Sequence, residues 1–221
     1  MFTEENYIFK YKRPGIAVDV VLFTIKDDDL KVGLIQRMEE PYLEKFALPG
    51  RFVRYEEPIE DTARTALKLK GGIDPEPVFL EQLYTFGQNL KRDTRIRTIS
   101  IVYYGLVDSQ KIDFQTGSKF VWESVYKLPP LAFDHKDVIE YAIKRLRKKV
   151  LESDFAFQLM PEEFTLSELQ KAYEIILNKD LDKRNFRKKI MELHILKDLK
   201  RQKMEGAHRP AQLYSFSRTK K

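Results

Sequence analysis

The sequence predicts an α+β fold, with a larger layered domain over residues 1–150 and a smaller domain over residues 151–221. Strand-like segments dominate the first 125 residues, and helical patterns there are few and well separated. The balance of charge changes sign near residues 151–163. Beyond that point, two helical patterns are followed by two strand-like segments, which are enough for a small domain with its own core.

The composition excludes several classes of protein. With 43% hydrophobic and 33% charged residues, the chain supplies both a core and a solvated surface, unlike a disordered protein. No apolar run approaches the roughly 20 residues that span a bilayer, and the N-terminus has no secretory signal. The chain has no cysteine and three widely spaced histidines, which argues against disulfides, thiolate catalysis and a metal site. We therefore expect a cytoplasmic protein without membrane contact, cofactor or bound metal.

The first domain is predicted from a series of strand patterns and two helices. Residues 15–25 are nearly continuously apolar and β-branched, as in a strand that is buried on both faces. Pro58, the acidic residues that follow it and the Gly71-Gly72 pair bound a helix over 58–70. An apolar stripe predicts a second helix over 135–151. The other strand signals lie at 30–37, 46–55, 78–87, 98–107 and 119–125.

The turn and helix at 50–72 resemble the Nudix box, whose pattern is G-x5-E-x7-R-E-U-x-E-E-x-G-U, where U is aliphatic. The residues that fall on this pattern are Gly50, Glu56, Arg64 and Gly71, and the sequence LPGRF leads into it. In this register the three glutamates of the R-E-U-x-E-E segment are replaced by Thr65, Lys68 and Leu69. Arg51 also departs from the usual LPGG.

Loss of these glutamates bears directly on chemistry. Carboxylates three and four residues apart on one helical face would together hold Mg²⁺ against a pyrophosphate. Thr65, Lys68 and Leu69 offer one weak oxygen, a cation and an apolar group, so we expect no catalytic residues and no enzyme activity. The alternative is an ADP-ribose or sugar-nucleotide pyrophosphatase with an atypical metal site, for which the remaining acids are Glu56, Glu57, Glu60 and Asp61.

Two helices with a short connection begin the second domain. Thr165 and Glu168 form a capping-box pattern, and Asp182 is a second N-cap candidate. The second helix is expected to bury Phe186, Ile190 and Leu193. Residues 183–221 hold 13 Lys and Arg against 3 Asp and Glu, which favours an anionic partner.

Strand-like segments at 196–202 and 211–217 flank a polar loop. Together with the two preceding helices and the positive charge, this hairpin predicts a winged helix-turn-helix domain that binds double-stranded DNA. The wing tip would reach phosphates or a minor groove. The alternative is a basic helical hairpin that serves only assembly. The candidate DNA-binding residues are Lys183, Arg184, Asn185, Arg187, Lys188, His208 and Arg209.

A degenerate Nudix domain followed by FTLSELQ, LDKRNFRKKI and HRPAQLYSF resembles the Nudix-related transcriptional regulators. The resemblance implies a Nudix-like mixed β-sheet and helix sandwich followed by a winged helix-turn-helix domain. It implies a ligand-sensing, non-catalytic Nudix domain and a homodimeric repressor or activator on an inverted-repeat operator. Some branches of the family respond to ADP-ribose and control NAD metabolism, whereas others respond to sugars such as arabinose. The sequence leaves open the effector, the operator and the direction of the response.

Related domains bind their nucleotide or sugar where several arginines and one aromatic residue of this chain lie. Arginine offers bidentate contacts to phosphate, and an aromatic ring can stack on a base or sugar. The candidate ligand-binding residues are Arg37, Arg51, Phe86, Arg92, Arg95 and Arg97. Trp122 is expected in the core, and Tyr103 and Tyr104 are expected to divide between core and solvent.

Overall fold

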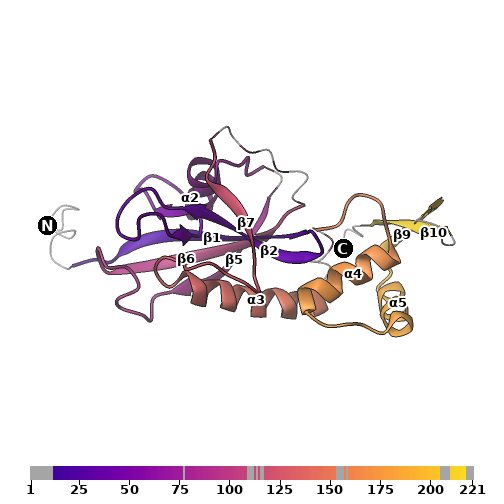
Figure 1. Cartoon of the computed structure of the whole chain (residues 1–221). Coiled ribbons are helices and arrows are strands. Elements are labelled where there is room, and N and C mark those ends of the chain that lie inside the picture. Colours follow the sequence, from indigo (N-terminus) through magenta and orange to yellow (C-terminus); the bar gives the residue numbers. More distant parts are fainter. Residues whose placement is uncertain are drawn as a thin grey trace, which may run out of the picture.

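The fold was established from a computed structural model, which describes residues 12–76, 78–108, 112, 114, 117–152, 157, 159–204 and 210–217. Figure 1 shows a twisted sheet with helix α2 on one face and helix α3 along the other. Helices α4 and α5 and strands β9 and β10 lie at one end of α3. This arrangement confirms the predicted α+β fold class.

The sheet of the first domain is mixed. Its order is β3-β2-β1-β6-β5, with β4 paired to β1 and β7 paired to β2. Strands β1 and β6 are parallel, and the other described pairings in this sheet are antiparallel. The strands are β1 (Gly15–Lys26), β2 (Asp29–Gln36), β3 (Phe46–Ala47), β4 (Gly50–Phe52), β5 (Phe79–Phe86), β6 (Thr98–Leu106) and β7 (Phe120–Ser124).

Both faces of the sheet are covered, which explains the continuous apolar sequence of β1. Val21 and Phe23 pack into the core beneath α3 (His135–Glu152), whereas Val20 and Leu22 enter the core beneath α2 (Ile59–Ala66). The prediction for Tyr103 and Tyr104 was therefore wrong. Neither tyrosine faces solvent, because neighbouring residues of β6 enter opposite cores.

Helix α2 continues directly into one π-helical turn, η1 (Leu67–Gly71). The turn ends at Gly72, whose φ of 63° lies in the left-handed region that favours glycine. Ile73 follows and is fully buried. The wider π-helical turn changes which side chains after Leu67 face the sheet.

The second domain contains β8 (Phe164–Thr165), α4 (Leu166–Leu177), α5 (Lys183–Glu192), β9 (Leu196–Lys203) and β10 (Ala211–Phe216). Both predicted N-caps are confirmed: Thr165 and Glu168 form a complete capping box, and Asp182 accepts a hydrogen bond from the backbone N–H of Asn185. Strand β10 pairs with β8 and β9, which makes the three-stranded sheet of a winged helix.

One core prediction for α5 was wrong. Phe186 and Ile190 are buried as expected, but Leu193 is 46% exposed. The helix ends at Glu192, and His194 follows with φ of 52°. Leu193 therefore does not continue the buried stripe, because the chain leaves helical geometry before it completes another turn.

The two domains share a continuous apolar core. Residues of α4 and α5, including Ile176 and Phe186, belong to the same buried cluster as β1 and α3. The Tyr126 hydroxyl donates to the carbonyl of Ile175, and Arg147 Nε donates to that of Ile176, each at 2.9 Å. In the described part of the chain, no helix is long and apolar enough to cross a membrane.

Candidate functional site

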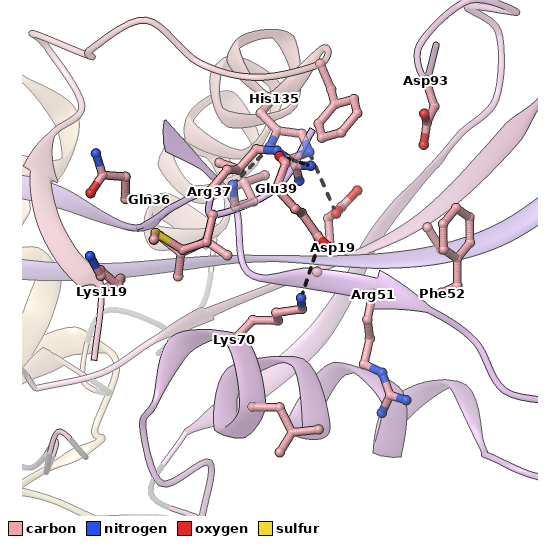
Figure 2. Close-up of a pocket in the computed structure, with 18 of the residues that line it drawn as sticks. Asp19, Gln36, Arg37, Glu39, Arg51, Phe52, Lys70, Asp93, Lys119 and His135 are labelled. Atoms are coloured by element: carbon pink, nitrogen blue, oxygen red, sulfur yellow. Dashed lines mark hydrogen bonds and ion pairs between the residues drawn. The ribbon is translucent and has the colours of Figure 1, made fainter. Parts of the chain in front are cut away.

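A cavity of about 620 Å³ lies between the π-helical turn that follows α2 and the segment that leads into α3. Its walls come from the middle of β1, the end of β2, the β3–β4 turn, the π-helical turn and the loops before β6, β7 and α3. Figure 2 shows charged side chains from these separate segments converging on one space. The volume lies within the range of roughly 300–1,000 Å³ that is usual for small-molecule sites.

A buried ionic cluster forms the floor of this cavity. Arg92 donates to both carboxylate oxygens of Asp134, at 2.8 and 3.0 Å, and its Nη2 lies 3.5 Å from Asp19 Oδ2. Ser100 Oγ donates to the same Asp19 oxygen at 2.6 Å. A Cβ added at Gly50 would lie 2.1 Å from Asp19 Oδ1, so glycine is required for this close approach. These contacts therefore fix the side chains that form the floor of the cavity.

Burial and charge act in opposite directions within the cluster. Burial lowers the pKa of Arg92, but its hydrogen bonds to Asp134 and the charge of Asp19 outweigh that effect and raise it. Burial lowers the pKa of His135, although Asp19 and Asp134 oppose this. His135 Nδ1 accepts a hydrogen bond from the backbone N–H of Leu48 at 2.9 Å, which requires that nitrogen to be unprotonated.

Two arginines meet on one aromatic ring at the cavity wall. The guanidinium carbons of Arg37 and Arg95 lie 4.9 and 5.4 Å from the centroid of Phe133. Arg95 is held by Asp93, whereas Arg37 donates to the backbone carbonyls of Glu39 and Pro41. Burial lowers the pKa of Arg37, and the nearby Arg95 adds to this effect. An anion placed here would face two guanidinium groups whose positions are already set.

Arg51 lies at the edge of the same cavity, where it turns toward the helical segment (Figure 2). Its Nη1 forms an ion pair with Glu57 Oε1 at 3.0 Å, and Thr65 donates to the same oxygen at 3.1 Å. The other carboxylate oxygen of Glu57 is buried without a hydrogen-bond partner among the described residues. Burial tends to raise the pKa of Glu57, but the hydrogen bond from Thr65 and the charge of Arg51 lower it.

A different charged surface lies on α5. Its buried side is formed by Phe186 and Ile190, and the opposite side is solvent-exposed. None of the exposed cations on α5 forms an ion pair with a carboxylate of the described residues. The exposed residues include the predicted DNA contacts Lys183, Arg184, Asn185, Arg187 and Lys188.

Three of the four cations of the wing strand β9 differ from those of α5, because each has a carboxylate partner. Lys200 pairs with Asp198, Arg201 with Glu163, and Lys203 with Glu168. Their charge is therefore partly compensated within the domain. His208 and Arg209, the predicted wing-tip contacts, lie outside the described residues.

A family model described as the NrtR DNA-binding winged helix domain matches residues 156–216. The chain is also 38% identical to the ADPR responsive transcriptional repressor NtrR of Acinetobacter baylyi, over 97% of this chain and 89% of that protein. The chain belongs to the NrtR family of Nudix-related transcriptional regulators.

Solved structures of NrtR from Shewanella oneidensis are similar over both domains. The complex of that protein with a 27mer DNA is 36% identical, with a TM-score of 0.79, and covers 91% of this chain and 93% of that one. The complex of its NUDIX domain with ADP ribose is 36% identical, with a TM-score of 0.56, and covers 66% and 99%. An ADP-ribose pyrophosphatase of Methanocaldococcus jannaschii is 32% identical over 59% of this chain and 73% of that protein.

The structure favours an alignment of this chain with the Nudix box that lies one residue later than the alignment expected from the sequence. Glu57, and not the exposed Glu56, turns inward to meet Thr65. Gly72 has the left-handed φ, and buried Ile73 supplies the final aliphatic position. In this register the three glutamate positions hold Ala66, Leu69 and Lys70. Carboxylates are again absent from all three positions.

Four of the six predicted ligand residues line the cavity of this NrtR-family chain, namely Arg37, Arg51, Arg92 and Arg95. Phe86 lies outside it and packs with Tyr84 and Tyr141 on the α3 side of the sheet. Arg97 is also outside, because its guanidinium donates to the carbonyls of Gly87, Asn89 and Thr98.

Other cavity residues were missed by the sequence reasoning, including Asp19, Glu39, Lys70, Phe133 and His135. Asp19 carried a usable signal, because it is the single charge inside the otherwise apolar run of residues 15–25. His135 and Phe133 carried none, since only the fold brings the start of α3 beside β1.

Proposed function

We propose that this chain is a transcriptional repressor whose DNA affinity depends on whether ADP-ribose occupies the Nudix cavity. The observation that carries this proposal is the presence, in one chain, of two different cationic surfaces. The cavity holds cations fixed by short contacts, as recognition of a small anion requires. Helix α5 holds exposed, uncompensated cations on a helix-turn-helix, as recognition of a polyanion requires.

ADP-ribose is the effector that the cavity and the relatives favour together. The relative from Acinetobacter is named as ADPR responsive, and the NUDIX domain of the Shewanella protein was solved with ADP ribose. The cavity offers Arg37 and Arg95 for a pyrophosphate, and the rings of Phe52 and Phe133 for a base or sugar.

We expect the Nudix domain to bind this ligand without hydrolysing it. A divalent cation needs several oxygen ligands, and the glutamate positions hold Ala66, Leu69 and Lys70 instead. Glu57 supplies a carboxylate, but its Oε1 is already paired with Arg51. Among the described residues there is no group of three or more His, Asp or Glu able to hold a metal ion. The residues present therefore do not fit the metal that Nudix hydrolases use.

The contacts between the domains provide a route by which the ligand can affect DNA binding. Strand β2 ends at Gln36, which lines the cavity together with the next residue, Arg37. The turn before β2 places Asp28 in an ion pair with Lys171 of α4. The contacts from Tyr126 and Arg147 fix the C-terminal end of α4. A shift of β2 would therefore move the helix pair that carries the DNA-binding surface. In a homodimer, two such surfaces would match an inverted-repeat operator.

The test is a fluorescence-anisotropy titration of the full-length protein on the DNA upstream of its own gene, with and without saturating ADP-ribose. We expect ADP-ribose to change the affinity for DNA by at least about fivefold, the lower end of typical allosteric coupling. By linkage, the operator duplex should change the affinity for ADP-ribose by the same factor.

Parallel titrations with AMP and arabinose serve as controls. A response to arabinose and not to ADP-ribose would contradict the proposed effector. Release of AMP from ADP-ribose that rises with Mg²⁺ and disappears in Glu57→Gln would instead identify a hydrolase.

A further inference from the structure

The π-helical turn places a lysine where a Nudix hydrolase has a metal-binding glutamate. Lys70 lines the cavity, as does Leu69 before it, whereas Lys68 is exposed and lies outside the cavity lining. Leu67 and Gly71 are buried on the other side of the turn. Figure 2 shows Lys70 extending from this turn toward the centre of the cavity.

The partner of Lys70 is weakly held. Its Nζ lies 3.5 Å from Glu39 Oε1, and the two side chains are 48% and 63% exposed. An ion pair this exposed contributes little to stability, so a stronger anion can replace the carboxylate. Arg37 donates to the backbone carbonyl of Glu39, which keeps that residue at the cavity mouth. Glu39 therefore competes for the same cation that an entering phosphate would contact.

Electrostatics gives this arrangement a direct consequence. A pyrophosphate carries negative charge that a Nudix hydrolase neutralises with metal ions held by glutamates. Here the glutamate positions offer no such ligands, and one of them carries a positive charge that repels a metal ion and attracts the phosphates. The fixed guanidinium groups of Arg37 and Arg95 add to this positive charge.

We infer that the Lys70 ammonium replaces the divalent cation of a Nudix hydrolase and binds the pyrophosphate of the effector directly, displacing Glu39. Ligand binding is then independent of divalent metal. The identity of the effector as ADP-ribose rests on the proposed function, but the requirement for Lys70 applies to any ligand that places a pyrophosphate in this cavity.

The experiment measures the dissociation constants of ADP-ribose and of inorganic pyrophosphate by calorimetry on the full-length protein, in EDTA and in Mg²⁺. Lys70→Met should weaken both ligands about tenfold, the range for loss of one charge-assisted hydrogen bond. Lys68→Met removes the same charge from the same turn outside the cavity and should change neither constant by more than about twofold. Glu39→Gln should tighten binding, because it removes the competing carboxylate. The unmodified protein should bind equally well in EDTA and in Mg²⁺.

Each result separates this inference from the proposed function. Tighter ADP-ribose binding by tenfold or more in Mg²⁺, or equal effects of Lys70→Met and Lys68→Met, would overturn the inference and leave the effector assignment intact. Pyrophosphate binding that depends on Lys70 while ADP-ribose does not bind would uphold the inference and remove the effector. If neither ADP-ribose nor pyrophosphate bound, the inference about Lys70 and the proposed effector would both be contradicted. Melting temperatures of the three variants establish that each is folded.

Discussion

The cations of the cavity and those of α5 differ in how the rest of the protein holds them. Arg92 is 5% exposed and bound by two carboxylates, and Arg95 and Arg51 each have a carboxylate partner. On α5, Arg184 and Arg187 are exposed and form no ion pair with the described carboxylates. The same residue type is thus rigid in one region and solvated in the other.

This difference matches the two kinds of anion that the proposed function assigns to the cavity and to α5. A small anion is bound well when the groups around it are already in place, because little side-chain freedom is then lost on binding. DNA presents a repeating row of phosphates, so solvated cations gain affinity largely by releasing counterions. Carboxylate partners on α5 would weaken the attraction of its cations for phosphates. In the cavity, loss of the carboxylate partners would leave the cations without fixed positions and would leave Arg92 buried with an uncompensated charge.

The largest expected effect comes from breaking the buried cluster. Arg92→Met leaves Asp19 and Asp134 buried without their cation, which should lower the free energy of unfolding by about 3–5 kcal/mol. Urea denaturation of the full-length protein measures this loss. Lys136→Met, which removes one member of an exposed pair with Glu140, is the control and should change stability by less than about 1 kcal/mol. Equal losses of unfolding free energy in the two variants would show that the buried cluster around Arg92 does not stabilise the fold.

Removing α5 cations should affect binding and not stability. Arg184→Ala and Arg187→Ala should each weaken DNA binding by about 1–3 kcal/mol and reduce the salt slope by about one. Neither should change the free energy of unfolding by more than about 0.5 kcal/mol, because both side chains are exposed. Anisotropy titrations at several salt concentrations give both quantities.

The control for α5 is Lys200→Ala on the wing strand, where Asp198 already partly compensates the charge. Its salt slope should stay close to that of the unmodified protein. If Lys200→Ala reduced the salt dependence of DNA binding as much as Arg187→Ala does, ion pairing would not explain a difference between the β9 and α5 cations.

The smallest effect concerns pH. Burial lowers the pKa of His135 in the folded protein, whereas the unfolded chain titrates near about 6.5. Between these two values the unfolded state binds more protons, so stability is full above about pH 6.5 and falls as the pH drops toward the folded pKa. The slope from this group is at most about 1.4 kcal/mol per pH unit. Asp19, Asp134, Arg92 and Arg37 are the charged groups that act on His135.

His135→Asn keeps a hydrogen-bond acceptor for Leu48 and removes the titration. Denaturation midpoints between pH 7 and pH 5 should therefore fall more steeply in the unmodified protein than in this variant. If the denaturation midpoints of the two proteins changed equally with pH, the titration of His135 would not contribute to the pH dependence of stability.

Local chemistry in the sequence was sufficient for much of the fold. The continuous apolar run of β1, the capping box of Thr165 and Glu168 and the N-cap at Asp182 all depend on residues a few positions apart. For the same reason the exposed cationic side of α5 was predictable, because helical periodicity alone separates it from Phe186 and Ile190. Interactions of this range are encoded in adjacent residues and need no knowledge of the rest of the chain.

The composition of the candidate ligand-binding cavity depended on the tertiary structure. The structure shifted the Nudix register by one residue, because Glu57 and not Glu56 turns inward to meet Thr65. Lys70 and not Lys68 therefore occupies a glutamate position and lines the cavity. Asp19, Arg92 and His135 meet only because β1, the loop before β6 and the start of α3 pack together. Their charges and pKa values follow from burial and from partners distant in sequence, and neither property can be obtained from a residue's neighbours along the chain. The sequence therefore determined the elements and the exposed cationic surface of α5, and the packing of the sheet against its helices decided which side chains form the cavity.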